Sequence, residues 1–142
     1  MSRSIFFCLL LFLGLMVGGV VSVAAQELTV QSMQKDGIGQ YLADGKGMTL
    51  YYFAKDSPGK SVCTGDCLTK WPPLLVDGKT TVASGLDAKD FGELDTPGGK
   101  QVTFRGYPLY RFFKDAKPGD TTGQGVGGIW FVVDPRSFSL MQ

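Results

Sequence analysis

The chain has 142 residues, with 14 lysines and arginines, 13 aspartates and glutamates and no histidine. This balance of charge provides no basic surface, so we expect no nucleic-acid partner. The absence of histidine excludes Ser-His and Cys-His nucleophiles, imidazole-ligated zinc, blue-copper sites and haem attached through a C-x-x-C-H motif.

The N-terminal stretch has the features of an export signal. Arg3 provides a positive charge, residues 5–21 are apolar and uncharged, and residues 22–25 are small. This order predicts a signal peptide over residues 1–25 that is cleaved after Ala25. A retained membrane anchor is the alternative, because the apolar run reaches the lower limit for a spanning helix, but no stop-transfer charges follow it. No cysteine stands near Ala25, so a lipobox is missing, and we expect a periplasmic or secreted protein without a retained span.

The mature residues, 26–142, are enough for one small domain. We expect short strands at 27–30, 41–43, 48–53, 93–95, 101–104, 109–113 and 129–133. Asp-Gly pairs predict hairpin turns at 44–47 and 77–78, with positive φ at the central positions, and Thr-Pro-Gly-Gly predicts another at 96–99. Short helical turns are expected from Asp66 to Trp71, where two prolines follow, and over 85–91 with Asp87 as the cap.

Helical periodicity is not sustained over ten residues anywhere in the mature chain. The expected strands are short, and Gly, Pro and Asp separate them at intervals of about ten residues, which is typical of a sandwich or a small barrel. We therefore predict an all-β domain with mainly antiparallel strands.

An internal repeat organises the domain. The segment GMTLYYFAKDSP begins at Gly47, and GYPLYRFFKDAKPGD begins at Gly106, 59 residues later. Because neither half can bury a face alone, we expect two tandem β repeats, at about 38–76 and 98–135, packed as one domain about a pseudo-two-fold axis.

Six large rings and two carboxylates recur at that spacing: Tyr51 and Tyr110, Phe53 and Phe112, Trp71 and Trp130, Asp56 and Asp115. The rings are predicted to form the core, since large aromatic side chains are mostly buried. The alternative is a pair of aromatic platforms for a sugar, aromatic or quinone-like ligand.

The two aspartates each end a strand just before Pro and Gly, a context that favours turn capping. Two alternatives remain for Asp56 and Asp115. They could bind a ligand or cation, or they could form the carboxylate pair of a carbohydrate-active enzyme, which requires a separation of about 5–10 Å.

The mature chain keeps two cysteines, Cys63 and Cys67. In an exported protein this pair predicts a structural disulfide, which stabilises the fold by about 2 kcal/mol because its loop is short. Thr122 and Val126 stand at the corresponding places of the second repeat, so the bridge is not needed to build the fold. A redox-active pair and a metal site are the alternatives, although two thiols without a third ligand are a poor metal site.

Three segments carry a family resemblance: GMTLYYFAKDSPGKSVCTGDCLTKWPPL, QVTFRGYPLYRFFKDAKPGD and GIWFVVDP. Together they resemble the bacterial secreted-repeat family, whose members are described as predicted lipoproteins with a Y-x-(F/W/Y)-x-x-D motif. The motif stands here at Tyr51–Asp56 and at Tyr110–Asp115. The resemblance implies an envelope protein and implies no particular activity.

The sequence therefore predicts an exported, non-catalytic β module that binds a small molecule or an envelope protein, without metal or cofactor. One alternative is a periplasmic redox or electron-transfer accessory that uses Cys63 and Cys67. The other is a carbohydrate-active enzyme that uses Asp56 and Asp115.

Overall fold

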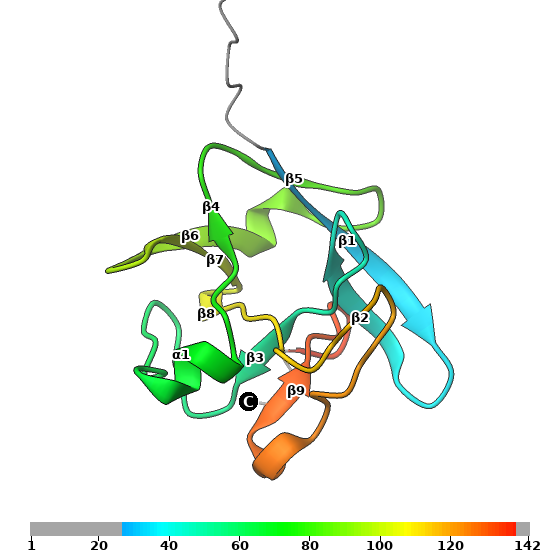
Figure 1. Ribbon diagram of the computed structural model, residues 1–142. Coiled ribbons are helices and arrows are strands. Elements are labelled where there is room, and N and C mark those ends of the chain that lie inside the picture. Colours follow the sequence, from blue (N-terminus) through cyan, green and yellow to red (C-terminus); the bar gives the residue numbers. More distant parts are fainter. Residues whose placement is uncertain (1–26, 139–142) are drawn as a thin grey trace, which may run out of the picture.

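The computed structural model describes residues 27–138 (Figure 1). The predicted signal peptide, residues 1–25, lies outside the described residues, as do residues 139–142. Within the described part, no helix is long and apolar enough to cross a membrane. The strands are β1 (Leu28–Lys35), β2 (Gly39–Asp44), β3 (Tyr51–Phe53), β4 (Leu75–Val76), β5 (Thr80–Val82), β6 (Phe91–Thr96), β7 (Gly99–Phe104), β8 (Tyr107–Pro108) and β9 (Trp130–Val132). The helices are α1 (Asp66–Lys70) and the 3₁₀ turns η1 (Ala88–Asp90) and η2 (Val126–Gly128).

The strands form three small sheets. One sheet has the order β2-β1-β5, a second pairs β3 with β9, and the third has the order β4-β7-β6 with β8 also paired to β7. All ladders are antiparallel except that between β1 and β5. The all-β, mainly antiparallel fold predicted from the sequence is therefore confirmed. Figure 1 shows the β4-β7-β6 sheet on the left and β1 and β2 on the right, with β3 and β9 below them.

The two repeats pack through reciprocal contacts, as a pseudo-two-fold relation requires. Tyr51 and Tyr110 lie opposite each other, and each donates its backbone N–H to the carbonyl of the other, at 2.8 and 2.9 Å. Three further backbone hydrogen bonds recur at equivalent places in the two repeats, with the donor named first. They are Gly59 N to Gly106 O with Gly119 N to Gly47 O, Leu42 N to Val133 O with Val102 N to Leu74 O, and Leu50 N to Leu42 O with Leu109 N to Val102 O. These pairs make β2 and β7 equivalent, along with the hairpins β1–β2 and β6–β7.

Two clusters of buried side chains hold the sheets together. The first is mostly aliphatic and takes residues from all three sheets; it comprises Val30, Leu42, Leu50, Tyr52, Leu74, Val76, Val102, Phe104, Leu109, Val133 and Phe138. The second lies at the repeat interface; it comprises Tyr41, Ala43, Tyr51, Phe53, Cys63, Trp71, Tyr110, Phe112, Trp130 and Val132. Every member of the second cluster is at least nine-tenths buried, so the contact between repeats is itself a core.

Several predicted turns form where expected. The β6–β7 hairpin closes at residues 96–99. Helix α1 begins at Asp66 and ends before Trp71. In the 3₁₀ turn η1, the Asp87 side chain accepts the Lys89 N–H at 2.9 Å, as a cap should.

The chain turns back at 44–47 as predicted, since the Asp44 N–H donates to the Met48 carbonyl at 2.9 Å and Ala43 pairs with Thr49. The backbone conformation of this turn differs from the prediction, because Gly45 and Lys46 are not at positive φ and only Gly47 is, at +83°. The Asp44 carboxylate shapes this turn instead, by accepting the N–H groups of Lys46 and Met48. The predicted hairpin at 77–78 is absent from the described fold, because β5 pairs in parallel with β1 rather than with β4.

The expected strand at 109–113 is reduced to two isolated bridges, both at Tyr110. Tyr110 pairs with Pro73 at the position equivalent to the β3–β9 pair of Tyr51 and Val132. Pro72 and Pro73 have no N–H to donate, so the ladder that forms between β3 and β9 cannot extend in the second copy.

Candidate functional site

The repeated rings form one continuous stack across the repeat interface. Trp71 and Trp130 lie face to face with centroids 3.9 Å apart and planes 2° apart. Phe112 stacks on Trp71 at 4.1 Å, and Phe53 stacks on Trp130 at 4.3 Å. Tyr51 and Tyr110 meet the two indoles edge-on, at 5.4 and 5.1 Å. No ring of this stack is more than 8% exposed, so none offers the open platform that the ligand-binding alternative needs.

Each motif tyrosine donates to the motif aspartate of the other repeat. The Tyr51 hydroxyl donates to Asp115 Oδ2 at 2.7 Å, and the Tyr110 hydroxyl donates to Asp56 Oδ2 at 2.6 Å. Burial, with a further contribution from the carboxylate acceptor, raises the pKa of both phenols well above the ordinary value. Burial also raises the pKa of Asp56, although the bonds from Tyr110 and Val62 oppose that shift. The motif thus joins the two repeats through two buried hydrogen bonds.

The second oxygen of each aspartate caps the following loop. Asp56 Oδ1 accepts the Val62 N–H at 2.7 Å, and Asp115 Oδ1 accepts the N–H and hydroxyl of Thr122 at 3.0 and 2.6 Å. Both carboxylates are buried and engaged on both oxygens. This arrangement does not support the hypothesis of a carbohydrate-active enzyme built on these two residues.

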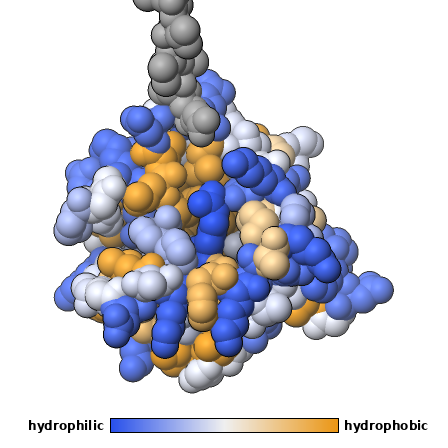
Figure 2. All heavy atoms as spheres, viewed as in Figure 1, coloured by the Kyte–Doolittle hydropathy of each residue, from blue (hydrophilic) through white to orange (hydrophobic). Residues whose placement is uncertain are grey.

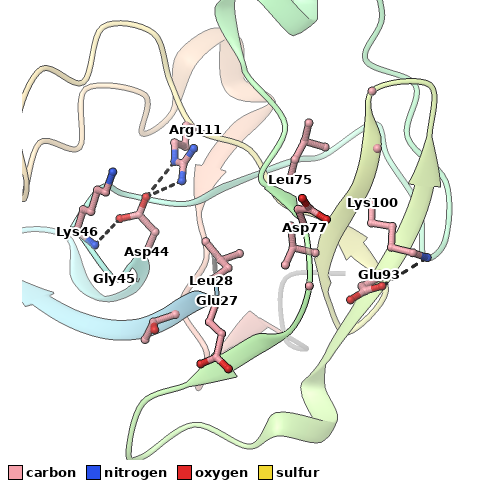
Figure 3. A pocket seen from close by; sticks show the side chains of 15 residues that line it. Glu27, Leu28, Asp44, Gly45, Lys46, Leu75, Asp77, Glu93, Lys100 and Arg111 are labelled. Carbon is pink, nitrogen blue, oxygen red and sulfur yellow. Dashed lines mark hydrogen bonds and ion pairs between the residues drawn. The ribbon is translucent and has the colours of Figure 1, made fainter. Parts of the chain in front are cut away.

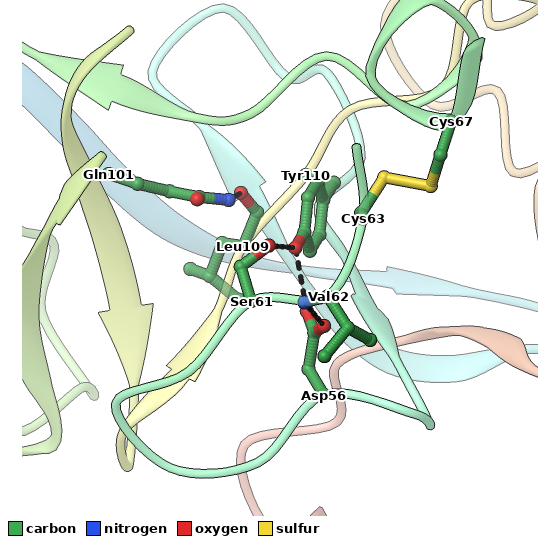
Figure 4. Close-up of a disulfide and its surroundings, with 8 residues drawn as sticks. All are labelled: Asp56, Ser61, Val62, Cys63, Cys67, Gln101, Leu109 and Tyr110. Carbon is green, nitrogen blue, oxygen red and sulfur yellow. Dashed lines mark hydrogen bonds between the residues drawn. A yellow bond between two sulfur atoms is a disulfide. The ribbon is translucent and has the colours of Figure 1, made fainter. Parts of the chain in front are cut away.

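The cysteine loop supports one of these aspartates. Cys63 and Cys67 form a disulfide with Cα atoms 5.4 Å apart. Figure 4 shows the segment before the bridge folded around the Tyr110 hydroxyl, which also bonds Ser61 Oγ at 2.6 Å. Cys63 is buried and Cys67 is half-buried. Among the described residues, no group of three potential ligands could hold a metal ion. The redox hypothesis stays a prediction, which the reduction potential of the pair would test.

A large hollow lies away from the motif. It is an open groove of about 1090 Å³ between the edge of the β4-β7-β6 sheet and the start of β1 with the β2 turn. Leu28, Leu75 and Val76 provide its apolar lining. Figure 2 shows hydrophobic surface on this face among hydrophilic side chains. Its charged residues are Glu27, Asp44, Lys46, Asp77, Glu93, Lys100 and Arg111 (Figure 3).

One guanidinium in the groove is held in place by a buried carboxylate. Arg111 Nε and Nη2 donate to Asp44 Oδ2 at 3.0 and 2.8 Å. The Asp44 side chain is only 3% exposed, whereas that of Arg111 is 39% exposed. Asp44 Oδ1 is occupied by the two N–H groups of its turn. The remaining guanidinium N–H groups, including both on Nη1, meet no acceptor among the described residues, so they face the groove ready for a ligand oxygen.

The sequence prediction did not include this groove. A signal was present, because Arg111 stands at the place that Tyr52 holds in the first repeat, 59 residues earlier. A charge that replaces a ring between two copies marks a place where the copies have different surroundings. The position of Asp44 opposite Arg111, 67 residues away in the chain, depends on the tertiary fold.

Comparisons with known proteins identify the repeat. The chain matches a family described as a secreted repeat of unknown function, over residues 32–75 and 95–134. These two matches contain both copies of the tyrosine–aspartate motif and both tryptophans. Neither the comparison with curated proteins nor the comparison with solved structures found a match. Since the two matched segments together cover more than half of the chain, the protein belongs to this family of secreted repeats.

Proposed function

We propose that the protein is an exported, non-catalytic binding module that holds its ligand in the groove beside Arg111. The family description supports export. The predicted signal peptide, with cleavage after Ala25 and no lipobox, supports a location in the periplasm or the medium. The ligand is a small molecule or a segment of an envelope protein.

The chemistry of the groove favours binding over catalysis. Its lining has no cysteine, serine or tyrosine, and its one hydroxyl, on Thr29, is bonded to Thr81 at 3.1 Å. The groove therefore offers no thiol or free hydroxyl as a nucleophile. The Asp44 oxygens are occupied, and Lys100 is paired with Asp95 and Glu93 at 3.0 and 3.6 Å. What remains is an apolar floor, the fixed guanidinium of Arg111 and the exposed charges of Glu27, Lys46 and Asp77. An apolar floor with a few polar groups is typical of a ligand site.

The observation that carries this proposal is the fixed guanidinium of Arg111. A flexible side chain loses conformational entropy when it binds a ligand. A partner that already holds the side chain in place lowers this entropic cost. Asp44 does so from a buried position, and it leaves one edge of the guanidinium to the groove. A purely structural ion pair has no need of an adjoining groove.

The test is a ligand-class titration of the exported protein followed by amide NMR. The probes are inorganic phosphate, an N-acetylglucosamine tetramer and short acidic peptides. We expect one class to shift the amides of Gly45, Gly78 and Gly98, which line the groove. The amide of Gly59, in the loop after the first motif, should remain unchanged. If none of these classes shifts the groove amides at millimolar concentration, the proposal is wrong.

A further inference from the structure

The last described residues show how a chain segment fills the equivalent of this groove. Phe138 is 1% exposed. Its ring packs edge-on against Tyr52, Tyr107 and Phe104, with centroids 4.9, 5.3 and 5.4 Å apart. The preceding backbone is held as well, because Arg105 Nη2 donates to the Pro135 carbonyl at 3.2 Å. A short turned segment is thus bound through one side chain and one carbonyl.

The groove is the counterpart of that filled site in the other repeat. The repeat spacing of 59 places Arg111 at the position of Tyr52, Met48 at that of Tyr107, and Lys46 at that of Arg105. The equivalent strands β2 and β7 both end here, with Asp44 and Phe104 as their last residues. The equivalent positions are thus those around Arg111, Asp44 and Lys46, and Figure 3 shows these three residues together at one end of the groove.

No chain segment occupies this counterpart within the described fold. After the second repeat the chain turns back and places Phe138 on the core. After the first repeat it turns at Asp77 and Gly78 and continues into β5, which pairs with β1. The parallel β1–β5 ladder therefore draws the chain away from the place that a tail would fill.

The edge of β4 offers this place a backbone partner. Leu74 O accepts the Val102 N–H, and Leu75 lies opposite Gln101. Paired residues alternate between bonded and non-bonded positions in an antiparallel ladder, so the N–H and C=O of Leu75 point away from β7. Its side chain lines the groove and Leu75 is 40% exposed. An extended segment can add to such an edge.

The lining differs from the filled site in charge. Where Phe138 meets the rings of Tyr52 and Phe104, a ligand in the groove meets the Arg111 guanidinium. Lys46, at the position of Arg105, has no ion-pair or side-chain partner among the residues described. Arg111 thus favours a carboxylate in place of the ring, and Lys46 favours a carbonyl or a second carboxylate oxygen. Glu27, Asp77 and Glu93 also line the groove, and their charges disfavour a polyanion such as a polyphosphate.

We infer that the groove binds a turned or extended peptide segment that presents a carboxylate to Arg111 and a backbone carbonyl to Lys46. The carboxylate belongs either to an acidic side chain or to a C-terminus. This inference rests on the proposed function, because it names the ligand class of the same groove.

The experiment uses peptides based on the chain's own segment DPRSF, residues 134–138. The first peptide, acetyl-DPRSE-amide, replaces the ring with a carboxylate. The second, acetyl-DPRSG with a free C-terminus, tests the other source of the carboxylate. The third, acetyl-DPRSQ-amide, is the neutral control, which has no net charge and lacks a carboxylate at its last residue. The N-acetylglucosamine tetramer and inorganic phosphate are the non-peptide probes. Each is titrated into the exported protein while the amides of the groove glycines are followed.

We expect at least one carboxylate peptide to bind about tenfold more tightly than the neutral peptide, which corresponds to one charge-assisted contact. Lys46→Gln should weaken this peptide about threefold, and Arg111→Gln should abolish the preference for the carboxylate. Arg136→Gln is the matched control, since Arg136 is exposed and outside the groove. Arg111→Gln leaves the buried Asp44 carboxylate without its partner and can unfold the protein. Lys46 is exposed, so Lys46→Gln tests the site without this loss of stability.

The outcomes separate this inference from the proposed function. If the saccharide or phosphate shifts the groove amides and no peptide does, the peptide inference is wrong and the binding function stands. Equal affinity for the neutral and acidic peptides contradicts the role of Arg111. If no probe shifts the groove, both conclusions are overturned.

Discussion

Replacing Tyr110 with phenylalanine tests the reciprocal bonds between the repeats. The change removes a 2.6 Å hydrogen bond from a buried phenol to Asp56 and leaves the ring in place. A hydrogen bond to a charged group contributes about 1.5–3 kcal/mol, and the carboxylate oxygen left behind adds a desolvation cost. We therefore expect the free energy of unfolding to fall by about 3 kcal/mol.

Tyr51 makes the equivalent contact, because its hydroxyl donates to Asp115 and accepts the Gly123 N–H at 3.1 Å. The two substitutions should cost the same within about 1 kcal/mol, because the contacts are equivalent. For a domain of this size, 3 kcal/mol corresponds to a decrease in Tm of about 12 °C.

The measurement is urea unfolding of the exported protein, followed by Trp fluorescence, together with a thermal scan. Tyr107→Phe is the matched control, because that half-buried hydroxyl has no hydrogen bond within the described residues; it should change stability by less than about 0.5 kcal/mol. A double-mutant cycle between Tyr110→Phe and Asp56→Asn should give a coupling energy of about 2 kcal/mol. If Tyr110→Phe is as stable as the control, the hydrogen bond between Tyr110 and Asp56 does not stabilise the fold, and the prediction is wrong.

Three further predictions concern pH, a close backbone contact and the disulfide. Burial raises the pKa of the Tyr51 and Tyr110 phenols, so above about pH 10 the unfolded chain loses protons that the folded state keeps, and the free energy of unfolding falls by about 1.4 kcal/mol per pH unit for each phenol. Tyr110→Phe should reduce that slope by the contribution of one phenol in urea melts between pH 9 and 12. An unchanged slope would contradict the assignment of the slope to Tyr110. An alanine Cβ at Gly106, where φ is +87°, would lie 2.8 Å from Pro58 Cβ, whereas at Gly59, with φ of +73°, it meets nothing within 4 Å. Gly106→Ala should therefore lower the free energy of unfolding by at least about 1 kcal/mol more than Gly59→Ala, because the backbone strain is common to both. Equal Tm values for the two variants would show that the contact with Pro58 relaxes freely. Replacing both bridged cysteines with serine should lower the free energy of unfolding by about 2 kcal/mol, since the closed loop is short, and loss of the folded near-UV circular dichroism spectrum would show instead that the bridge is essential.

Residue order was enough to predict the fold class and the way in which the repeat is used. The recurrence of Tyr, Phe and Trp at one spacing indicated a core shared by two halves, because small domains need large rings to bury enough apolar area. The positions of Asp56 and Asp115 before Pro and Gly indicated turn capping, and their Oδ1 atoms do cap the following loops. These features are local, or they repeat at a constant offset, so residue order is enough to find them.

Other features depended on contacts that residue order does not specify. Each motif tyrosine donates a hydrogen bond to the aspartate of the other repeat. This pairing depends on how the two repeats pack against each other, which the sequence of one motif does not specify. The wrong hairpin at 77–78 has the same origin, since Asp-Gly permits a turn but does not select the partner of the next strand. The parallel pairing of β5 with β1 was decided by distant residues.

The groove depends on tertiary contacts more than any other feature described above. A residue-by-residue view of the motif treats Arg111 as the exposed neighbour of two core rings. In the folded chain it meets a carboxylate from the first repeat, at a place where the chain continues differently after each half. One half is closed by the segment that ends in Phe138, and the other is left open because its chain continues into β5. The repeat builds the core through equivalent contacts, and the site arises where that equivalence ends.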